Sequence, residues 1–129
     1  MNERMPDCSR GEIWMLNWEP RRESGQGGHR SAHPRASSGP VLIIQTDLGN
    51  HAPGARTTIV VPLTTQGRPF VFYAPIPKTK ENGLPADSWA NCTQLFTVDK
   101  TRLEKKLGKA TAAQIAKVGE AVKGTLELR

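Results

Sequence analysis

The chain has 129 residues, which is enough for one domain with a single hydrophobic core. Hydrophobic residues make up 36% and charged residues 23%, which excludes a disordered chain, and no run reaches the ~18 apolar residues of a membrane-spanning helix. The 18 Lys and Arg against 12 Asp and Glu give a formal charge of +6, which favours a polyanionic partner such as nucleic acid, although a solvated basic surface explains it equally.

Neither the N-terminus nor the cysteines indicate secretion or metal binding. The first residues, MNERMPDCSRGE, contain no apolar stretch of a secretory signal, so we expect a cytoplasmic protein. Cys8 and Cys92 lie far apart and outside any zinc-binding spacing, which predicts reduced, structural thiols. The sequence contains no P-loop, HExxH or GxSxG motif, and we expect no metal and no other cofactor.

Strand patterns dominate the first hundred residues. EIWMLNW (12–18) predicts a first strand, and the Gly- and Ser-rich stretch that follows predicts a long polar loop at about 19–39. Further strands are predicted from apolar and β-branched runs, at 40–46, 57–63, 68–76 and 89–98. Pro62 indicates an edge or a bulge in its strand, and the segments between strands are rich in turn residues.

Helical signals come only at the end. Asp99 can cap a short helix, KTRLEKKL, that stops at Gly108, and Thr111 with Gln114 forms a possible capping box for a terminal helix. The apolar face of that terminal helix is predicted at helical spacing, from Ile115, Val118, Val122 and with less regularity Leu126. The pattern predicts a single domain over 1–129, α+β but mainly β: a small β-barrel with a C-terminal helix.

The absence of a metal motif is compatible with chemistry on RNA. RNA carries its own nucleophile, because a positioned 2′-OH can attack the adjacent phosphorus. The protein then has to move protons and stabilise the developing negative charge. Arginine, threonine, serine or histidine side chains can do both without a metal.

Several segments, taken in order, resemble the MazF/PemK toxins of bacterial type II toxin–antitoxin systems. The resemblance runs from about Arg10 to the C-terminus, apart from the long loop. It rests on RGEIWMLNWEP, GH at 28–29, PVLIIQTDLGN, VVPLTTQ, GRPFVF, GLPADSW, QLFTVDKTRL and the closing helix. No one of these motifs is specific, and their order carries the resemblance.

The resemblance implies an SH3-like, PemK-like β-barrel with a C-terminal helix, usually in a homodimer. It implies a metal-independent, sequence-specific endoribonuclease that cleaves single-stranded RNA and leaves a 2′,3′-cyclic phosphate and a 5′-OH. It also implies inhibition by a cognate MazE-like antitoxin with an extended acidic tail. A charge of +6 suits both an RNA substrate and an acidic inhibitor.

The resemblance places the catalytic threonine of the family at Thr64, after the strand VVPLT. Its hydroxyl would donate to a phosphate oxygen as negative charge builds. A threonine favoured for its β-propensity at a strand end is the structural alternative. Thr65 and Gln66 continue the match as RNA contacts or, equally, as turn residues.

The family's catalytic arginine directly precedes the Pro-Val of the second strand, and here that position is Gly39. Three explanations stay open. Arg35 or Arg30 supplies the guanidinium from the loop, the arginine has been lost, or His29 or His33 supports another scheme. We expect Arg35 to stabilise charge, since a guanidinium stays protonated, and His29 to transfer protons, since a histidine titrates near 6.5. An exposed loop histidine with no role is the alternative for His29.

Gln94 keeps a glutamine of the family, and we expect it to contact RNA together with Arg30 and Arg68, although a lone surface arginine such as Arg68 more often has no specific role. Thr93 stands where some relatives have an acidic residue, and Phe96 stands where an arginine is common. Besides the nuclease, two hypotheses remain: a silenced protein that still binds RNA or antitoxin, which Gly39 favours, and a gyrase-directed toxin of related fold, which the TTQ and GH segments disfavour.

Overall fold

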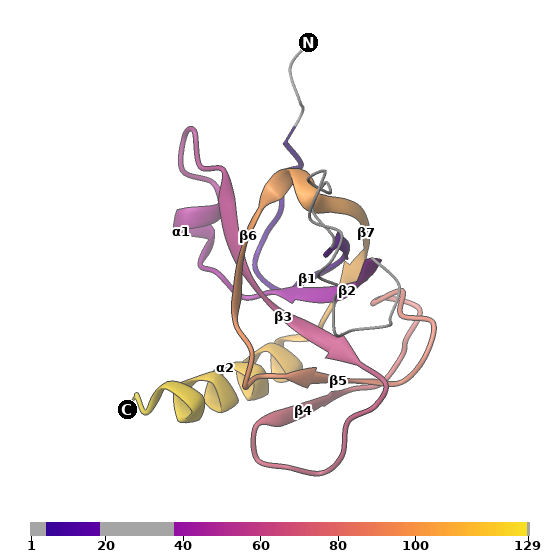
Figure 1. Cartoon of the computed structure of the whole chain (residues 1–129). Helices are drawn as coiled ribbons and strands as arrows, with labels where there is room; N and C mark the ends of the chain where they lie inside the picture. The colour runs from indigo at the N-terminus through magenta and orange to yellow at the C-terminus, as the bar shows by residue number, and fades with distance from the viewer. Residues whose placement is uncertain (1–4, 19–37, 129) are drawn as a thin grey trace, which may run out of the picture.

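A computed structural model describes residues 5–18 and 38–128 (Figure 1). The predicted polar loop therefore lies outside the described residues except for its last two, Ser38 and Gly39, which begin a strand. The division into one domain with a long loop stays a prediction. Among the described residues, no helix is both long and apolar enough to span a membrane.

The described chain forms seven strands, two α-helices and one 3₁₀ helix. The strands are β1 (Glu12–Asn17), β2 (Ser38–Ile43), β3 (Thr57–Thr64), β4 (Tyr73–Ile76), β5 (Ser88–Asn91), β6 (Phe96–Asp99) and β7 (Leu103–Lys109). The helices are α1 (Asp47–Asn50), the 3₁₀ helix η2 (Lys100–Arg102) and α2 (Ala112–Leu126). The prediction of an α+β fold that is mainly β, with a C-terminal helix, is confirmed.

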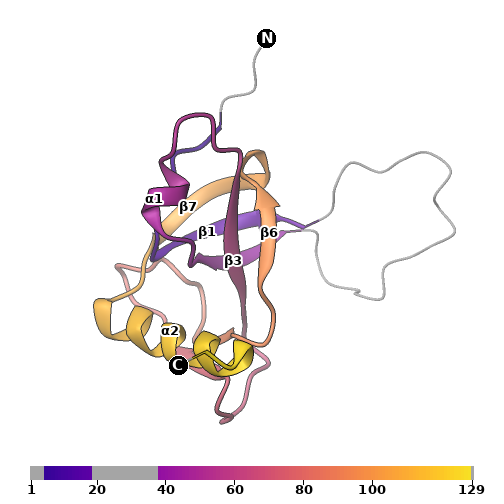
Figure 2. The ribbon, with the colours of Figure 1, turned by 90° about the vertical axis from the view of Figure 1, so that its left-hand side faces the viewer.

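The strands form one antiparallel sheet in the order β4-β5-β3-β2-β1-β7, and β6 pairs separately with β3. Among the described strands, no ladder joins β6 to β7, so the sheet is not closed by hydrogen bonds. The 3₁₀ helix η2 connects these two strands instead, and the sheet curls into a barrel-like shape (Figures 1 and 2).

Strand β3 is the centre of the fold, because it pairs with three other strands. One of its edges pairs with β2, and the other pairs with β6 up to Val60 and with β5 from Leu63. Pro62 lies where β3 changes partner, and no ladder with β5 or β6 includes it. This position tolerates a residue that has no backbone N–H. Pro62 therefore marks a break in pairing within a central strand rather than an edge strand.

Two apolar clusters lie on the two faces of the sheet. One includes Val61 and Leu63 of β3 and packs beneath α2, which crosses one face of the molecule (Figure 2). The other includes Val41 of β2 and Val60 of β3 and fills the inside of the curled strands. Because side chains alternate along a strand, β3 contributes successive residues to different clusters.

The capping box of α2 is confirmed. Thr111 Oγ1 accepts a hydrogen bond from the Gln114 backbone at 3.1 Å, and Gln114 Oε1 accepts one from the Thr111 backbone at 2.9 Å. Val118 is fully buried and Ile115 and Val122 pack against the same cluster, as their spacing predicts. Leu126 is 50% exposed, so the buried face ends before it.

The short helix predicted over KTRLEKKL is wrong. Asp99 does act as a cap, since its carboxylate accepts from the Thr101 backbone at 2.9 Å, but it caps only η2. The chain then enters β7, which pairs with β1. The free edge of β1 offers backbone hydrogen bonds that outweigh the helix propensity of lysine and leucine.

Three other boundaries differ from the prediction. The strand predicted at 68–76 forms only from Tyr73, because a turn precedes it, in which the Tyr73 N–H donates to the Phe70 carbonyl at 3.0 Å. The strand predicted at 89–98 is two strands, β5 and β6, which contact different parts of β3. The segment after β2 contains α1, capped by the Thr46 hydroxyl, where only turns were expected.

Candidate functional site

Thr64 ends β3 and is half-buried, at the start of the connection to β4. Its Oγ1 accepts a hydrogen bond from the Gln66 backbone N–H at 3.0 Å, which forms a tight turn. This bond uses a lone pair of the hydroxyl, so the Thr64 proton stays free to donate elsewhere. Thr65 and Gln66 are both exposed beside it.

The connection after Thr64 is fixed to β5 by a close approach. A Cβ added at Gly67 would lie 2.2 Å from Cγ of Trp89, so the Gly67 backbone lies directly on the indole ring. Trp89 is also the residue that pairs with Thr64 across the β3–β5 ladder. The same tryptophan therefore holds both the strand end and the turn that follows it.

Arg68 extends from this turn over two aromatic rings. Its guanidinium carbon lies 5.4 Å from the Phe70 ring centroid and 5.5 Å from that of Tyr73, within the range of cation–π attraction. The two rings meet edge to face at 5.7 Å. The sequence analysis predicted Arg68 as an RNA contact but missed this aromatic setting, which the spacing RPFVFY signals.

Gly39 lies in β2 opposite Leu16 of β1. The β2–β3 ladder ends with Val41 opposite Pro62, and Gly39 and Thr64 each lie two residues beyond that pair. Because side chains alternate between the two faces along a strand, Gly39 and Thr64 lie on the same face of the sheet as Val41 and Pro62. A Cβ added at Gly39 would lie 3.4 Å from Trp18 Nε1, which is an ordinary contact, so this position accommodates a Cβ.

The neighbourhood of Gly39 contains an aromatic pair. The rings of Trp18 and Phe96 meet edge to face, with centroids 4.8 Å apart, and Phe96 is 37% exposed. Trp18 packs against the cluster that includes Val41 and Val60, and Phe96 covers the Trp18 ring from outside this cluster. Arg102 Nη1 donates to the carbonyls of Asn17 and Trp18, at 3.2 and 3.3 Å, which fixes the end of β1.

Gln94 is exposed in the turn that joins β5 to β6, and its backbone N–H donates to Asn91 at 3.3 Å. Both of these strands pair with β3, so the turn lies beside the strand that ends in Thr64. Thr93, at the acidic position of some relatives, donates instead to Asn91 Oδ1 at 2.6 Å.

The predicted residues of the polar loop cannot be placed. His29, Arg30, Arg35 and His33 all lie outside the described residues. The proposal that a loop arginine replaces the one missing at Gly39 stays a prediction. The described candidates divide into one group on the β3–β4 connection, from Thr64 to Arg68, and Gln94 in the neighbouring turn.

The third histidine, His51, lies in a separate structural cluster. Its Nε2 lies 3.0 Å from Ser9 Oγ and 3.1 Å from the carbonyl of Cys8. Burial raises the pKa of the Cys8 thiol and raises that of Cys92 to about 11, so both are protonated at neutral pH, as structural thiols should be. Within the described ranges, no three His, Cys, Asp or Glu residues gather as metal ligands.

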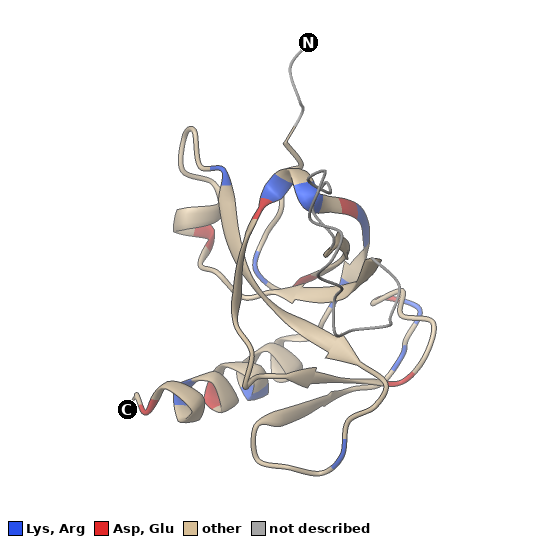
Figure 3. Ribbon diagram, viewed as in Figure 1, with Lys and Arg blue, Asp and Glu red and all other residues tan. Residues whose placement is uncertain are grey.

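The basic residues of the described chain are unevenly spread. They are concentrated on η2 and β7, whereas Arg68 stands alone on the connection between β3 and β4 (Figure 3). The basic residues of η2 and β7 are Lys100, Arg102, Lys105, Lys106 and Lys109. Of these, Lys100 is buried, and Lys106 forms an ion pair with Glu12 at 3.0 Å.

Comparison with known proteins shows the family of this chain. Residues 9–126 match the family described as PemK-like, MazF-like toxins of type II toxin–antitoxin systems. Endoribonuclease MazF9 of Mycobacterium tuberculosis is 27% identical over 92% of this chain and 96% of its own. Endoribonuclease EndoA of Bacillus subtilis is 32% identical over 92% of this chain and 94% of its own.

A solved structure has the same fold. An endoribonuclease in complex with its cognate antitoxin, from a mycobacterial species, superposes with a TM-score of 0.69 at 21% identity, over 95% of this chain and 97% of that one. The family match covers nearly the whole chain, and the fold agrees with it. The chain therefore belongs to the family of PemK-like, MazF-like toxins of type II toxin–antitoxin systems.

Proposed function

We propose that the protein is the toxin of a type II toxin–antitoxin system and acts as a sequence-specific endoribonuclease on single-stranded RNA, without a metal. The observation that carries the proposal is the Thr64 hydroxyl. It is oriented by the Gln66 N–H at 3.0 Å and keeps its own proton free at the end of β3. Relatives that match almost the whole chain are named endoribonucleases, which supports the same activity here.

The proposed reaction uses the substrate's own nucleophile. The 2′-oxygen of one nucleotide attacks the adjacent phosphorus, and the bond from phosphorus to the 5′-oxygen of the next nucleotide breaks. The 2′-OH proton passes to a base, and the leaving oxygen takes up a proton. The products are a 2′,3′-cyclic phosphate and a 5′-OH, and no oxidant, metal or other cofactor is needed.

The Thr64 hydroxyl would donate to a non-bridging phosphate oxygen, where negative charge develops in the transition state. Its orientation by Gln66 reduces the reorganisation that the reaction requires. A guanidinium at the neighbouring strand end would add charge stabilisation, and Arg35 is the residue we propose for it, with His29 for proton transfer. Thr65, Gln66, Arg68, Gln94 and Arg30 are proposed as RNA contacts.

The proposed partners are RNA, a cognate MazE-like antitoxin and a second copy of the chain, in the cytoplasm. A structural neighbour was solved with its cognate antitoxin, which supports an antitoxin here. The formal charge of +6 suits an acidic inhibitor that competes with RNA.

Gly39 supports a second candidate, a silenced toxin that binds RNA or antitoxin without cutting. Glycine has no guanidinium to offer at the position where the resemblance implies one. A Cβ at this position makes only an ordinary contact with Trp18, so packing does not require glycine there.

The deciding experiment is incubation of the purified protein with a long single-stranded RNA in EDTA, followed by mapping of the RNA ends. The nuclease predicts discrete cuts that leave a 2′,3′-cyclic phosphate and a 5′-OH. Intact RNA with salt-sensitive binding supports the silenced toxin. Cutting that stops in EDTA contradicts the proposed metal-free reaction.

A further inference from the structure

We propose that Arg68, Phe70 and Tyr73 form a stacking platform that holds one unpaired base of the RNA substrate beside Thr64. The inference rests on the proposed function and assigns it a base-binding subsite. The platform is defined by these three residues, which belong to the connection between β3 and β4 and to the first residue of β4.

The three side chains are already assembled. The Arg68 guanidinium carbon is nearly equidistant from the two ring centroids, at 5.4 Å from Phe70 and 5.5 Å from Tyr73. Phe70 meets Tyr73 edge to face at 5.7 Å. A preassembled surface loses little side-chain entropy when a ligand binds.

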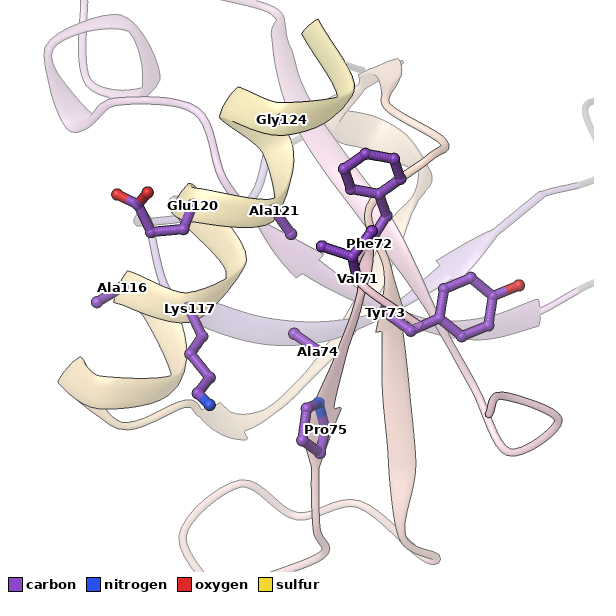
Figure 4. Close-up of a pocket in the computed structure, with 10 residues that line it drawn as sticks. All are labelled: Val71, Phe72, Tyr73, Ala74, Pro75, Ala116, Lys117, Glu120, Ala121 and Gly124. Carbon is purple, nitrogen blue, oxygen red and sulfur yellow. The ribbon is translucent and has the colours of Figure 1, made fainter. Parts of the chain in front are cut away.

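The platform is supported from behind by the C-terminal helix. Phe72 meets Phe70 edge to face at 5.6 Å and lies so close to α2 that a Cβ added at Gly124 would come 2.7 Å from its ring. Figure 4 shows the Phe72 ring near Gly124 and the Tyr73 ring directed away from the helix. Phe72 thus anchors the segment to α2, and the next residue, Tyr73, is directed away from the helix.

Exposure indicates that the platform serves a ligand rather than the core. Phe70 is 44% exposed and Arg68 is also exposed, while Tyr73 is half-buried beneath them. A large aromatic ring normally contributes to stability by leaving water. Here a cation covers part of the ring and leaves the rest accessible.

An unpaired base fits this chemistry better than other ligands do. Bases stack on aromatic rings and on guanidinium planes, and a sequence-tolerant stack of this kind is common in proteins that bind single strands. The Arg68 charge adds attraction for the phosphate of the same nucleotide. A purely apolar partner would have to bury that charge, which is unfavourable.

The platform is also in the right place. Arg68 is four residues after Thr64, and Gly67 between them is fixed on Trp89. The proposed hydroxyl donor and the platform therefore belong to one anchored segment. A base on the platform would fix the position of the strand relative to the phosphate at Thr64.

The test measures binding of a short single-stranded RNA that brackets a mapped cut, with the cleavage-deficient Thr64→Val protein. In that background, Phe70→Ala should weaken binding about tenfold. Phe70→Trp should keep the affinity, and Val71→Ala is the matched control, since Val71 is 73% exposed next to the platform. The same RNA is then prepared with single abasic sites, one position at a time.

Stacking predicts that one abasic position removes the effect of Phe70→Ala, because the base that contacts the ring is already missing. If Phe70→Ala lowers the RNA affinity equally at every abasic position, the platform is overturned and Phe70 is assigned to the folding of the connection. Unchanged RNA binding in Phe70→Ala, with weakened binding of an acidic antitoxin peptide, also overturns it. A wild-type protein that neither binds nor cuts RNA contradicts the proposed function itself, whereas full binding and cutting by Phe70→Ala contradicts the platform alone.

Discussion

The backbone of Gly67 lies on the indole ring of Trp89, and Trp89 pairs with Thr64 across the β3–β5 ladder. The residue proposed to act on the phosphate, the turn after it and the neighbouring strand are thus joined through one side chain. Gly67 is required here by close approach, since its φ angle is not in the left-handed region.

Gly67→Ala should therefore lower RNA cleavage more than it lowers stability. The added Cβ would lie 2.2 Å from the ring, so the turn has to move away from Trp89 and carry the Gln66 N–H with it. We expect kcat/KM to fall about tenfold or more, since small displacements of a catalytic group have large effects. The free energy of unfolding should fall by about 1–3 kcal/mol.

Gly119→Ala is the matched control, because its added Cβ meets nothing nearer than Arg10 at 3.8 Å on the surface of α2. Cleavage by Gly119→Ala should equal that of the wild type. Wild-type cleavage by Gly67→Ala would show that the anchored turn does not position the reaction.

Gly39→Arg tests whether a guanidinium is missing from the site. Cβ at this position makes an ordinary contact of 3.4 Å with Trp18 Nε1, so a side chain can begin here without displacing Trp18. If the loop supplies no arginine, cleavage should rise about 100-fold, the typical value of one charge-stabilising group. Initial rates of cleavage of one RNA at equal protein concentration measure this effect.

Gly39→Gln is the control for side-chain volume without charge, and it should not raise the rate. An unchanged rate in Gly39→Arg would indicate that the guanidinium is already supplied, and loss of cleavage in Arg35→Ala would then identify its source. A rise in both variants would contradict the charge argument.

The sequence predicted most of the fold, because its signals were local and agreed with the tertiary structure. The capping box of Thr111 and Gln114 began α2 as expected, and apolar runs located β1, β2 and β3. The strand β7 was missed because its lysines favour a helix locally, whereas pairing with β1 is a long-range interaction. Residues 89–98 form two strands because they pair with different parts of β3, and a local sequence pattern does not indicate such pairing.

The site was predicted less completely. A family resemblance placed Thr64, and the structure adds its bond with Gln66. The contact of Gly67 with Trp89 arises from tertiary packing, so spacing alone could not predict it, whereas the contact of Arg68 with Phe70 is local and the spacing RPFVFY indicates it. Trp89 lies 22 positions after Gly67 in the sequence and reaches it only because β5 pairs with β3.

Lys100→Met should destabilise the protein, because two backbone carbonyls lose the ammonium that donates hydrogen bonds to them. Lys100 is 5% exposed, and its Nζ donates to the carbonyls of Asn50 and Ala55 at 2.6 and 3.1 Å. Methionine fills a similar volume but leaves both acceptors without this donor. We expect the free energy of unfolding in urea to fall by about 2–3 kcal/mol.

Lys105→Met is the control for Lys100, since Lys105 is exposed on β7, and it should change stability by less than about 0.5 kcal/mol. Equal stability of the Lys100 and Lys105 variants would contradict a structural role for the buried ammonium.

We predict that the ionised Glu12 carboxylate stabilises the fold at neutral pH and that this stabilisation is lost in acid. Burial acts to raise the pKa of this carboxyl, but hydrogen bonds from Trp14, Ser9 and Lys106, with the charge of Lys106, lower it overall. A lowered pKa in the folded state contributes stability above the unfolded value, about 4.3, and this contribution is lost as pH falls through the folded value.

The free energy of unfolding should therefore decline below about pH 4.3, and Glu12→Gln should reduce it more at pH 7 than at pH 3. Urea unfolding at both pH values measures the difference. Glu120→Gln is the control, since Glu120 pairs with Lys123 at 3.6 Å on an exposed face and should have a smaller effect at pH 7. A Glu12→Gln effect that is as large at pH 3 as at pH 7 would exclude the ionised carboxylate as its cause.

The most direct measurement is RNA cleavage in EDTA by Thr64→Val and Thr64→Ser beside the wild type. Valine keeps the shape of threonine and lacks the hydroxyl, so kcat/KM should fall at least about 100-fold, with little change in the melting temperature. Serine keeps the hydroxyl and should retain activity within about tenfold of the wild type. Cleavage by Thr64→Val at the wild-type rate, with the same cyclic-phosphate ends, would contradict the assignment of the reaction to Thr64.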